Sequence, residues 1–488
     1  MSFVVGRPHY MADRHCGYCK GTKNDHYALD SQKEKADKAF FASSSESIFI
    51  GSTVELMDCQ HYDELMNQGF RRSGKFLYKP DQLRSCCRMY TIRTDLSYLK
   101  VNKQQRKILN RFIRAIGPEN ENENNSKSHK NQEKYDLKSL LEAEKNSTRF
   151  HTTYEPSMFT KEKFELYKKY QISVHNDKPN EVSEKSFERF LCETPFLEPE
   201  EEGTPEQWKS LQDWTKKLDP QRSNHIPKES RRIGPTHECY YLDDKLIAVS
   251  ILDFLPSGVS SIYFIWDPDY AHLSLGTVSG LREILMCNEL QLGYYYLGYY
   301  IDDCPKMNYK SKFGGEILDL TNEVYVPLTT VKPWLDKGRY FSIGNKNDSQ
   351  PIGEPDIDNN GKPISFESSR FFGKECINSA ELIYGNTHTE EVAKAAKKTL
   401  TSKYDVLLGN SRGYFNLPDV VPGITPLWKI LQMFESGVLS DEFTVHIAQG
   451  QTIQPYKLGQ LNGVGRQVVV DCIRLFGLDK VKQAIILV

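Results

Sequence analysis

The 488-residue sequence lacks any apolar run of the ~18–20 residues that a membrane-spanning helix needs. Its first residues, MSFVVGRPHY, also lack the basic-then-apolar order of a secretory signal. We therefore expect a cytoplasmic protein, with the nucleus as a further location and no membrane partner. Thiols stay reduced in these compartments, so the 11 cysteines point to packed side chains or metal ligands before disulfides.

Two phosphate-binding loops are missing as well. No Gly-x-x-x-x-Gly-Lys-Ser/Thr stretch occurs, so we expect no ATP. Acetyl-coenzyme A enzymes hold the pyrophosphate on a glycine-rich Arg/Gln-x-x-Gly-x-Gly/Ala loop ahead of a helix. The corresponding loop here, His272–Thr277, has one glycine and no arginine, so we expect no coenzyme A.

A formal charge of −2 conceals two local excesses. Residues 71–114 hold 13 Lys and Arg against two acids, whereas residues 181–206 hold nine Glu against two bases. Aromatic residues interrupt the basic stretch, a pattern typical of nucleic-acid binding because phosphates attract cations and unpaired bases stack on rings. The alternative, a solvated helix face, normally carries compensating acids. We predict nucleic-acid contacts at Arg71, Arg72, Lys75, Lys79, Arg84 and Arg88.

Four cysteines form two pairs. Cys16 and Cys19 are two residues apart, and Cys86 and Cys87 are adjacent. Four thiolates can hold zinc or an iron–sulfur cluster, and their softness does not separate the two. A disulfide or a metal-free redox pair is the alternative, and one thiolate could be replaced by His15, His26, His61 or Cys59. The isolated cysteines, Cys304 among them, are expected to pack as small hydrophobes.

The centre of the chain alternates strand and helix patterns. Three strands are predicted from Glu238 onward, two of them at 246–254 and 259–266, followed by a helix and a strand at 294–301. This order is found in GNAT-like acyltransferases, whose two central strands separate to admit the acyl donor. The predicted fold class is α+β, with a GNAT-like domain of mixed sheet and flanking helices plus a Cys-rich, metal-binding amino-terminal domain.

Composition shifts suggest four segments. Residues 1–117 form the Cys-rich, basic domain. Residues 118–150 include the Asn- and Glu-rich stretch PENENENNSKSHKNQEK and are expected to be a disordered linker or insert. Residues 151–345 form the transferase domain, with amphipathic helices at 160–171 and 183–192. Residues 346–488 are expected to form an extension packed on that domain.

Several blocks resemble the arginyl-tRNA–protein transferase family, fungal type. They run from Cys16 to about Trp334 and comprise CGYC, GFRRSGKFLYKPDQLRSCCRMYTIR, FELYKKYQISVH, KLIAVSILDFLPSGVSSIYFIWDP, LSLGT and YYYLGYYIDDCPKMNYK. The resemblance implies transfer of arginine from arginyl-tRNA to the α-amine of proteins that begin with Asp, Glu or oxidised Cys, in the Arg/N-degron route. A ubiquitin ligase of that route is a further expected partner. It also implies an iron–sulfur cluster or zinc at the cysteine pairs.

Such a reaction places modest demands on acid–base chemistry. The donor ester is already activated, and an α-amine with a pKa of about 7.7–8 is partly neutral at physiological pH. Positioning and donors aimed at the oxyanion must then supply most of the catalysis. The candidates are backbone amides around Tyr263 to Trp266 and the hydroxyls of Tyr263, Ser274, Tyr299 and Tyr300, although some of these hydroxyls could serve only packing or capping.

Substrate recognition calls for both signs of charge. The acidic first residue of the acceptor needs a cation, for which His237, Lys306, Lys310 and Arg282 are candidates. The arginyl side chain of the donor needs carboxylates, for which Asp267 and Asp302 are candidates. Two other functions remain open, a coenzyme A-dependent N-acyltransferase and a non-enzymatic, metal-bearing RNA-binding protein.

Overall fold

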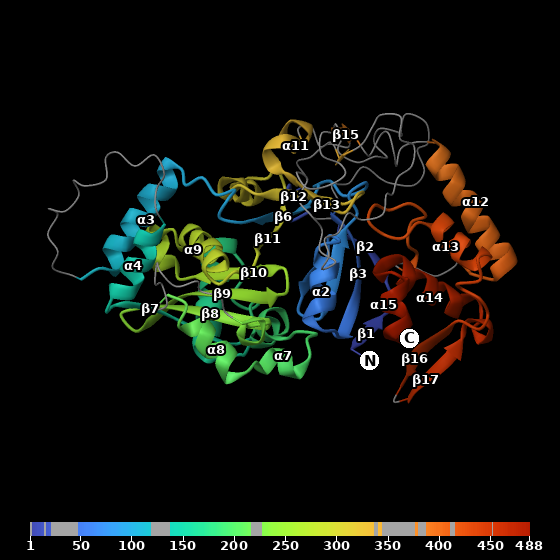
Figure 1. The fold of residues 1–488 in the computed structure, drawn as a ribbon, viewed down its shortest axis with the longest axis horizontal. Coiled ribbons are helices and arrows are strands. Elements are labelled where there is room, and N and C mark those ends of the chain that lie inside the picture. Colours follow the sequence, from blue (N-terminus) through green and yellow to red (C-terminus); the bar gives the residue numbers. More distant parts are fainter. Residues whose placement is uncertain are drawn as a thin grey trace. The chain divides into compact units, whose positions relative to one another are not determined.

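The computed structural model describes residues 2–13, 16–20, 47–118, 137–215, 227–335, 340–343, 376–378, 387–409, 415–450 and 452–488. The chain divides into two compact units (Figure 1). The terminal unit comprises Met1–Ile92, Tyr299–Tyr309 and Glu316–Val488, and the central unit comprises Arg93–Gly298 and Lys310–Gly315. The chain passes between them within strands β6 (Tyr90–Thr94) and β11 (Tyr294–Tyr300), and again after Tyr309 and after Gly315.

A mixed sheet forms the centre of the central unit. Strands β7 (Phe150–Pro156), β8 (Gly234–Leu242), β9 (Lys245–Leu255) and β10 (Gly258–Trp266) follow one another as antiparallel neighbours, and β10 pairs with β11 in parallel. The turn between β8 and β9 uses Asp243 and Asp244, both at positive φ (52° and 60°), as a tight two-residue hairpin requires.

Helices cover both faces of this sheet. Helix α9 (Leu275–Glu289) packs on one face, with α3 (Lys103–Ile116) and α4 (Lys138–Asn146) nearby. Helix α5 (Lys161–Tyr170) packs on β9 and β10 from the other face. Because both faces are covered, β9 is buried from Leu246 to Leu255. The remaining elements of this unit are η2 (Gln171–His175), α6 (Glu184–Phe187), η3 (Glu188–Cys192), α7 (Glu198–Glu202), α8 (Pro205–Gln212), η4 (Lys228–Ser230) and η5 (Pro268–Leu273).

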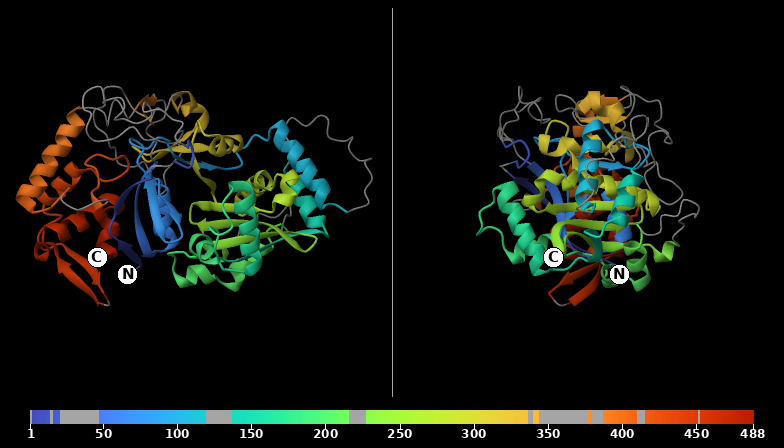
Figure 2. Two further views of the ribbon diagram at one scale, coloured as in Figure 1. Left: turned by 180° about the vertical axis from the view of Figure 1, so that it is seen from behind. Right: turned by 90° about the vertical axis from the view of Figure 1, so that its left-hand side faces the viewer.

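The terminal unit is built on a second sheet, which joins the two ends of the chain. Its strands run in the order β17-β16-β18-β1-β3-β5-β4, and β2 pairs with β3. Strand β1 (Phe3–Gly6) pairs in parallel with β18 (Ala484–Leu487), so the N- and C-termini lie close together (Figure 2). The other strands are β2 (His9–Asp13), β3 (Ser47–Leu56), β4 (Arg71–Ser73), β5 (Phe76–Pro80), β16 (Thr444–Gln449) and β17 (Thr452–Lys457).

Helices and two short strand pairs complete the terminal unit. The helices are α2 (Cys59–Met66), α10 (Pro305–Asn308), α11 (Leu328–Leu335), α12 (Thr387–Tyr404), α13 (Leu427–Glu435), α14 (Gly463–Phe476), α15 (Leu478–Gln483) and η11 (Leu458–Gln460). The strand pairs are β12 (Glu316–Asp319) with β13 (Val324–Pro327), and β14 (Phe341–Ile343) with β15 (Cys376–Asn378). Helix η6 (Tyr309–Phe313) spans the boundary between the units.

The α+β class is confirmed. The predicted helices at 160–171 and 183–192 are present as α5 and α6, but each continues into a π-helical turn, η2 and η3, which periodicity did not indicate. Within the C-terminal segment 346–488, strands β16 and β18 lie in the same sheet as β1, from the start of the chain. Residues 119–136 of the predicted linker lie outside the described residues, but helix α4 lies within the bounds predicted for that linker, 118–150.

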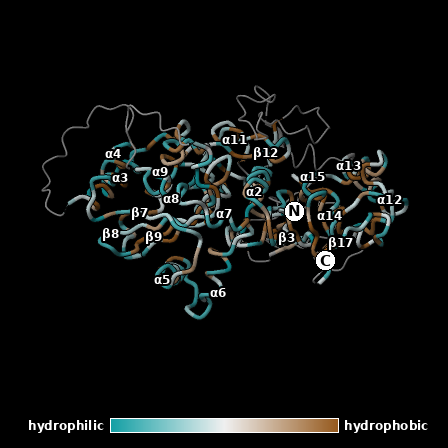
Figure 3. Tube along the Cα trace, turned by 60° about the horizontal axis from the view of Figure 1, so that its bottom comes forward, coloured by the Kyte–Doolittle hydropathy of each residue, from teal (hydrophilic) through white to brown (hydrophobic). Residues whose placement is uncertain are grey.

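Hydropathy along the chain follows the architecture. In Figure 3, hydrophobic residues gather in the sheet strands, whereas α3 alternates hydrophobic and hydrophilic positions. Helix α3 buries Ile108, Leu109 and Phe112 on one side, as an amphipathic helix does. None of the helices in the described ranges is long and apolar enough to cross a membrane.

Candidate functional site

Strands β10 and β11 pair over only a short stretch, and we call the region where they separate the fork. Pairing joins Gly258–Ser260 to Tyr294–Tyr296. Strand β10 nevertheless continues to Trp266 on its other side, where it pairs with β9 through an irregularity at Ile262. Within the described residues, the backbone of β10 beyond Ser260 therefore has no strand partner on the β11 side.

Burial changes at the same point. Gly258, Val259 and Ser260 are buried, whereas the four consecutive residues 261–264 are all half-buried. Successive residues of a strand point to opposite faces, so partial exposure of four in a row means that both faces of β10 are partly accessible along this stretch. The fork is the one part of the central strands β9 and β10 in which such exposure occurs.

Strand β11 contains a glycine that its backbone requires. Gly298 has φ of +78°, a conformation that glycine adopts without the steric cost other residues incur. A Cβ atom at Gly298 would lie 3.7 Å from Nζ of Lys310. The structure therefore places Lys310, one of the predicted acceptor-binding cations, beside β11, with only 7% of its surface exposed.

Tyr263 lies on the separated part of β10. Its hydroxyl is 3.1 Å from Oε1 of Gln171 and 3.2 Å from Nε2 of His175, both on the π-helical turn η2. Burial raises the pKa of Tyr263 well above its ordinary value. Sequence reasoning did not single out Gln171 or His175, although both lie in the block FELYKKYQISVH.

Ser274 lies directly before α9 in a left-handed conformation, with φ of +54°. It makes no side-chain cap for the helix, and instead its Oγ accepts a hydrogen bond of 2.9 Å from Nη2 of Arg111. The hydroxyl of a predicted catalytic residue is thus held by a cation from α3.

Two predicted substrate-binding cations are internal. Arg282 is fully buried and contacts the carboxylates of Glu144, at 2.8 Å, and of Glu238. His237 is also buried, with Nδ1 3.1 Å from Nζ of Lys163 and Nε2 3.0 Å from the carbonyl oxygen of Leu191. Both side chains therefore have partners inside the central unit.

The predicted acidic residues also have partners. Asp267 contacts Lys169 and lies 2.8 Å from Nζ of Lys245. Although burial opposes it, hydrogen bonds from these two lysines lower the pKa of Asp267. Asp302 accepts a hydrogen bond from the hydroxyl of Tyr300. Lys306, on α10, is exposed.

The predicted nucleic-acid contacts in 71–88 are mostly internal in the terminal unit. Arg71, Arg72, Lys79 and Arg88 are buried. Lys75 pairs with Glu55 at 2.9 Å, and Arg84 pairs with Asp81 at 2.8 Å. The exposed cations of the basic stretch lie instead further along the chain. Lys100 is exposed just before α3, and on α3 Lys103, Lys107 and Arg114 are exposed while Arg106 and Arg111 are half-buried.

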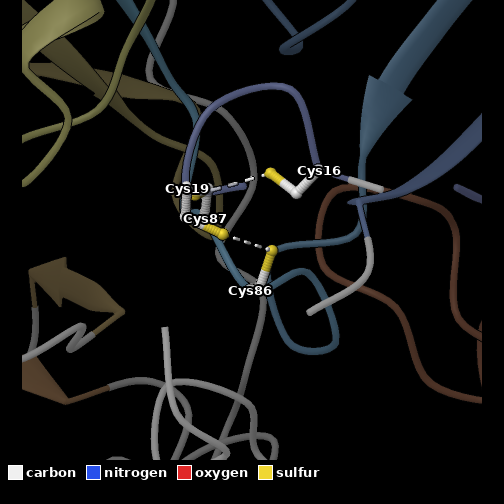
Figure 4. A group of neighbouring side chains, drawn as sticks. All are labelled: Cys16, Cys19, Cys86 and Cys87. Atoms are coloured by element: carbon white, nitrogen blue, oxygen red, sulfur yellow. Dashed lines mark hydrogen bonds between the residues drawn. The ribbon is translucent and has the colours of Figure 1, made fainter. Parts of the chain in front are cut away.

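The four paired cysteines converge in the terminal unit (Figure 4). All four sulfur atoms lie within 4.8 Å of one another. Cys16 and Cys87 are 3.7 Å apart, and Cys19 and Cys86 are 3.6 Å apart. Sulfur–sulfur hydrogen bonds with Cys86 and Cys87 lower the pKa of Cys16, which favours a thiolate there. The set of residues could hold a metal ion.

Residues from distant segments surround this cysteine cluster. Tyr299 and Cys304 pack against it and are buried. The hydroxyl of Tyr299 donates to the carbonyl oxygen of Gly69 at 2.8 Å. The predicted catalytic hydroxyl of Tyr299 is therefore part of the shell of the cysteine cluster. Cys304 is buried as expected, but its position beside the other thiols could not be read from its isolated place in the sequence.

A buried carboxyl on α9 gives a testable pH dependence. Glu283 accepts hydrogen bonds from Oγ of Ser250, at 2.6 Å, and from the hydroxyl of Tyr295, and burial raises its pKa to about 8. A raised folded-state pKa stabilises the protein at low pH, and that stabilisation is lost as pH rises toward the folded pKa. In wild type this group should therefore lower the free energy of unfolding by up to ~1.4 kcal/mol per pH unit between about pH 5 and about pH 8.

Glu283→Gln removes this ionisation. We expect urea unfolding at several pH values to show the variant gaining stability relative to wild type as pH rises through this window. Glu289→Gln, at the partly exposed end of the same helix, should follow the wild-type profile. Parallel pH profiles for wild type and Glu283→Gln would contradict the assignment.

Two segments of the chain match models of one protein family. Residues 14–107 match the family model described as "Arginine-tRNA-protein transferase, N terminus", and residues 162–319 match that for the C terminus. These matches include all four paired cysteines and the strands of the fork.

Individual relatives extend this likeness. Arginyl-tRNA–protein transferase 1 of Saccharomyces cerevisiae is 38% identical, over 99% of this chain and 98% of the relative. Arginyl-tRNA–protein transferase 2 of Arabidopsis thaliana is 41% identical over 42% of this chain and 32% of the relative. An aspartate/glutamate leucyltransferase of Campylobacter jejuni is 41% identical over 18% of this chain and 36% of the relative. The chain belongs to the arginyl-tRNA–protein transferase family.

Proposed function

We propose that the protein transfers arginine from arginyl-tRNA to the α-amine of proteins that begin with Asp, Glu or oxidised Cys. The observation that carries this proposal is the fork, where β10 and β11 separate. It occurs in a chain that aligns over nearly its whole length with a relative named an arginyl-tRNA–protein transferase. Separated strands offer unpaired backbone N–H groups to a carbonyl oxygen that gains charge during acyl transfer. Family membership further suggests a role in the N-degron route, with its ubiquitin ligase downstream, in the cytoplasm or nucleus.

The central unit supports a GNAT-like assignment. Its order is β8, β9, β10, α9 and β11, and the divergence of β10 from β11 is the feature that such acyltransferases use to admit an acyl donor. In this proposal the arginyl ester enters the fork, and the backbone between Tyr263 and Trp266 faces its carbonyl group. Lys310, beside β11, is the best placed of the predicted cations to meet an acidic first residue.

We place the tRNA on α3. Lys103, Lys107 and Arg114 lie on one face because their spacings of four and seven residues are close to whole helical turns. This helix has no acidic residue, so nothing on it compensates these charges. Arg111, on the same helix, reaches Ser274 at the start of α9, so the basic helix contacts the loop that follows the fork strand β10.

Charge reversal on α3 tests this placement. The triple variant Lys103→Glu, Lys107→Glu, Arg114→Glu should weaken tRNA binding and flatten its salt dependence, by about 0.9 in the log–log slope for each phosphate that the protein no longer neutralises. Lys75→Glu is the control, because Lys75 is already paired with Glu55 in the terminal unit. An unchanged slope in the triple variant, measured by titration at several salt concentrations, would exclude α3 from the tRNA site.

We propose that the cysteine cluster holds one zinc ion. With Zn–S bonds of about 2.3 Å, the sulfur atoms of a tetrahedral site are about 3.8 Å apart. Two of the sulfur–sulfur separations, 3.6 Å for Cys19–Cys86 and 3.7 Å for Cys16–Cys87, are close to this value, and all four sulfur atoms lie within 4.8 Å of one another. An iron–sulfur cluster distributes its thiolates over several iron atoms and needs a wider arrangement. Bound zinc would hold together the Cys16–Cys19 turn and the Cys86–Cys87 segment.

A transfer assay tests the activity itself. Purified protein is incubated with tRNA carrying labelled arginine and a peptide that begins with Asp or Glu, and the same peptide with an acetylated N-terminus is the control. We expect label only in the free-amine peptide. Transfer to neither peptide while the charged tRNA stays intact would overturn the proposal, and strong thermal stabilisation by acetyl-coenzyme A would favour the alternative N-acyltransferase.

A further inference from the structure

A chain of four polar side chains lies against the separated part of β10. Asp177, just after η2, accepts a hydrogen bond from Nε2 of Gln171 at 3.1 Å. Oε1 of Gln171 accepts from the hydroxyl of Tyr263 at 3.1 Å. The oxygen of Tyr263 lies 3.2 Å from Nε2 of His175. The chain thus runs from a carboxylate to an imidazole.

The order of donors in this chain fixes which nitrogen of His175 is basic. A carboxylate only accepts, so Asp177 orients the amide of Gln171 with its nitrogen toward Asp177 and its oxygen toward Tyr263. The single hydroxyl proton of Tyr263 then goes to Gln171. Nε2 of His175 must therefore carry the proton and donate it to the oxygen of Tyr263, which leaves Nδ1 as the unprotonated nitrogen of the neutral ring.

The backbone keeps this imidazole accessible. Gln171 and His175 lie at the two ends of the π-helical turn η2, and π-turns occur frequently at functional sites. Asn176 ends the turn in a left-handed conformation, with φ of +63°. His175 is exposed, and the edge of the Tyr170 ring meets the imidazole at 5.2 Å between centroids. A substrate can therefore reach a ring whose tautomer is set from inside the protein.

We propose that His175 is the proton-transfer residue for arginyl transfer, with Tyr263 and Gln171 as positioning residues; this inference rests on the proposed function. The acceptor nitrogen forms a bond to the ester carbonyl carbon, and the bond from that carbon to the ribose oxygen breaks. Nδ1 of His175 takes the proton that the amine loses. The same proton then passes to the ribose oxygen, which leaves with the bonding electron pair.

The surroundings of the imidazole suit this role. The titratable groups near it are Tyr170 on α5, Tyr263 on β10 and Asp177 after η2, with Tyr167 beside Gln171. The tyrosines at 167 and 263 stay neutral near physiological pH, because burial raises their pKa values. Asp177 supplies a carboxylate at the far end of the chain, where it accepts the hydrogen bond that orients the amide of Gln171.

His175→Gln tests the proposal. Positioned acid–base groups contribute about 10²- to 10⁴-fold to rate, so we expect kcat for arginyl transfer to fall by at least about 100-fold while KM changes little. The rise of kcat with pH through the histidine range should also disappear. Imidazole in solution should partly restore the rate of His175→Ala. His151→Gln is the matched control, because His151 is an exposed histidine of the same unit that stacks on Tyr241.

Variants of a positioning residue should change the kinetics of arginyl transfer differently from variants of His175. Tyr263→Phe removes the acceptor for Nε2–H, so we expect a smaller loss, about 10-fold in kcat, with the pH dependence retained but displaced. If wild type transfers arginine and His175→Gln keeps its kcat and pH profile, the inference is overturned while the proposed function stands. If wild type transfers none, the proposed function fails and the role of His175 falls with it. Thermal unfolding of each variant separates these outcomes from misfolding.

Discussion

A Cys87→Ser variant should lose most of its bound metal and unfold at a lower temperature than wild type. Metal binding to a thiolate site adds its binding free energy to folding, so loss of one ligand of four weakens both. We expect the free energy of unfolding to fall by at least about 2 kcal/mol, and Cys16→Ser should behave alike because the two sulfurs are neighbours at 3.7 Å. Metal content by elemental analysis and thermal unfolding measure the two effects.

Cys304→Ser is the matched control for this experiment. Cys304 packs in the same buried cluster but lies outside the group of four sulfurs within 4.8 Å of one another. Its replacement should leave the metal content at the wild-type value. Full metal occupancy in Cys87→Ser would refute the set of ligands, and a brown protein that contains iron would refute zinc.

The largest loss of stability in the central unit should follow Arg282→Met. Arg282 has no exposed surface and contacts two buried carboxylates, those of Glu144 and Glu238. Removing one partner of a buried ion pair leaves uncompensated charge and costs about 3–5 kcal/mol. Urea unfolding at neutral pH measures the loss. Arg149→Met is the control, because Arg149 pairs with the exposed Asp243, and exposed ion pairs contribute little to the free energy of unfolding.

The loss in Arg282→Met should depend on pH. Burial already raises the pKa of Glu144, although Arg282 opposes that rise. Without the arginine the pKa of Glu144 rises further, and a raised folded-state pKa stabilises the protein at low pH and loses that effect as pH increases. The deficit relative to wild type should therefore be smaller near pH 5 than near pH 8. If adding Glu238→Gln to Arg282→Met restores the free energy of unfolding, uncompensated charge causes the loss. If the loss does not depend on pH, missing side-chain packing causes it.

The central sheet was predictable because its signals are local. Hydrophobic periodicity and turn-forming residues predicted the strands at 246–254 and 259–266 and the helix after them. The structure contains these elements as β9, β10 and α9. The separation of β10 from β11 was expected only through the likeness to GNAT enzymes. Strand pairing is a long-range property, so the local sequence of β10 does not indicate that its pairing with β11 ends at Ser260.

The candidate site was harder to predict, because charge patterns do not report burial. Arg282 was considered a substrate-binding cation, but its carboxylate partner Glu144 lies far away in the sequence. Arg71 and Lys79 raise the positive charge of their stretch, yet both are buried. The cysteine pairs are the opposite case: their spacing predicted that four thiols meet, and they do. Spacing constrains geometry directly, whereas the location of a charge depends on the fold around it.

The parallel pairing of β1 with β18 has a consequence for synthesis. Strand β1 is made long before residues 484–487, so its partner strand does not yet exist when β1 is synthesised. The central unit is almost continuous in sequence, so it can fold while the chain is still growing. The sheet next to the cysteine cluster must wait for β18. We therefore expect the four thiols to remain in an unfinished unit until β18 has been made, and stable metal loading to follow the synthesis of that strand.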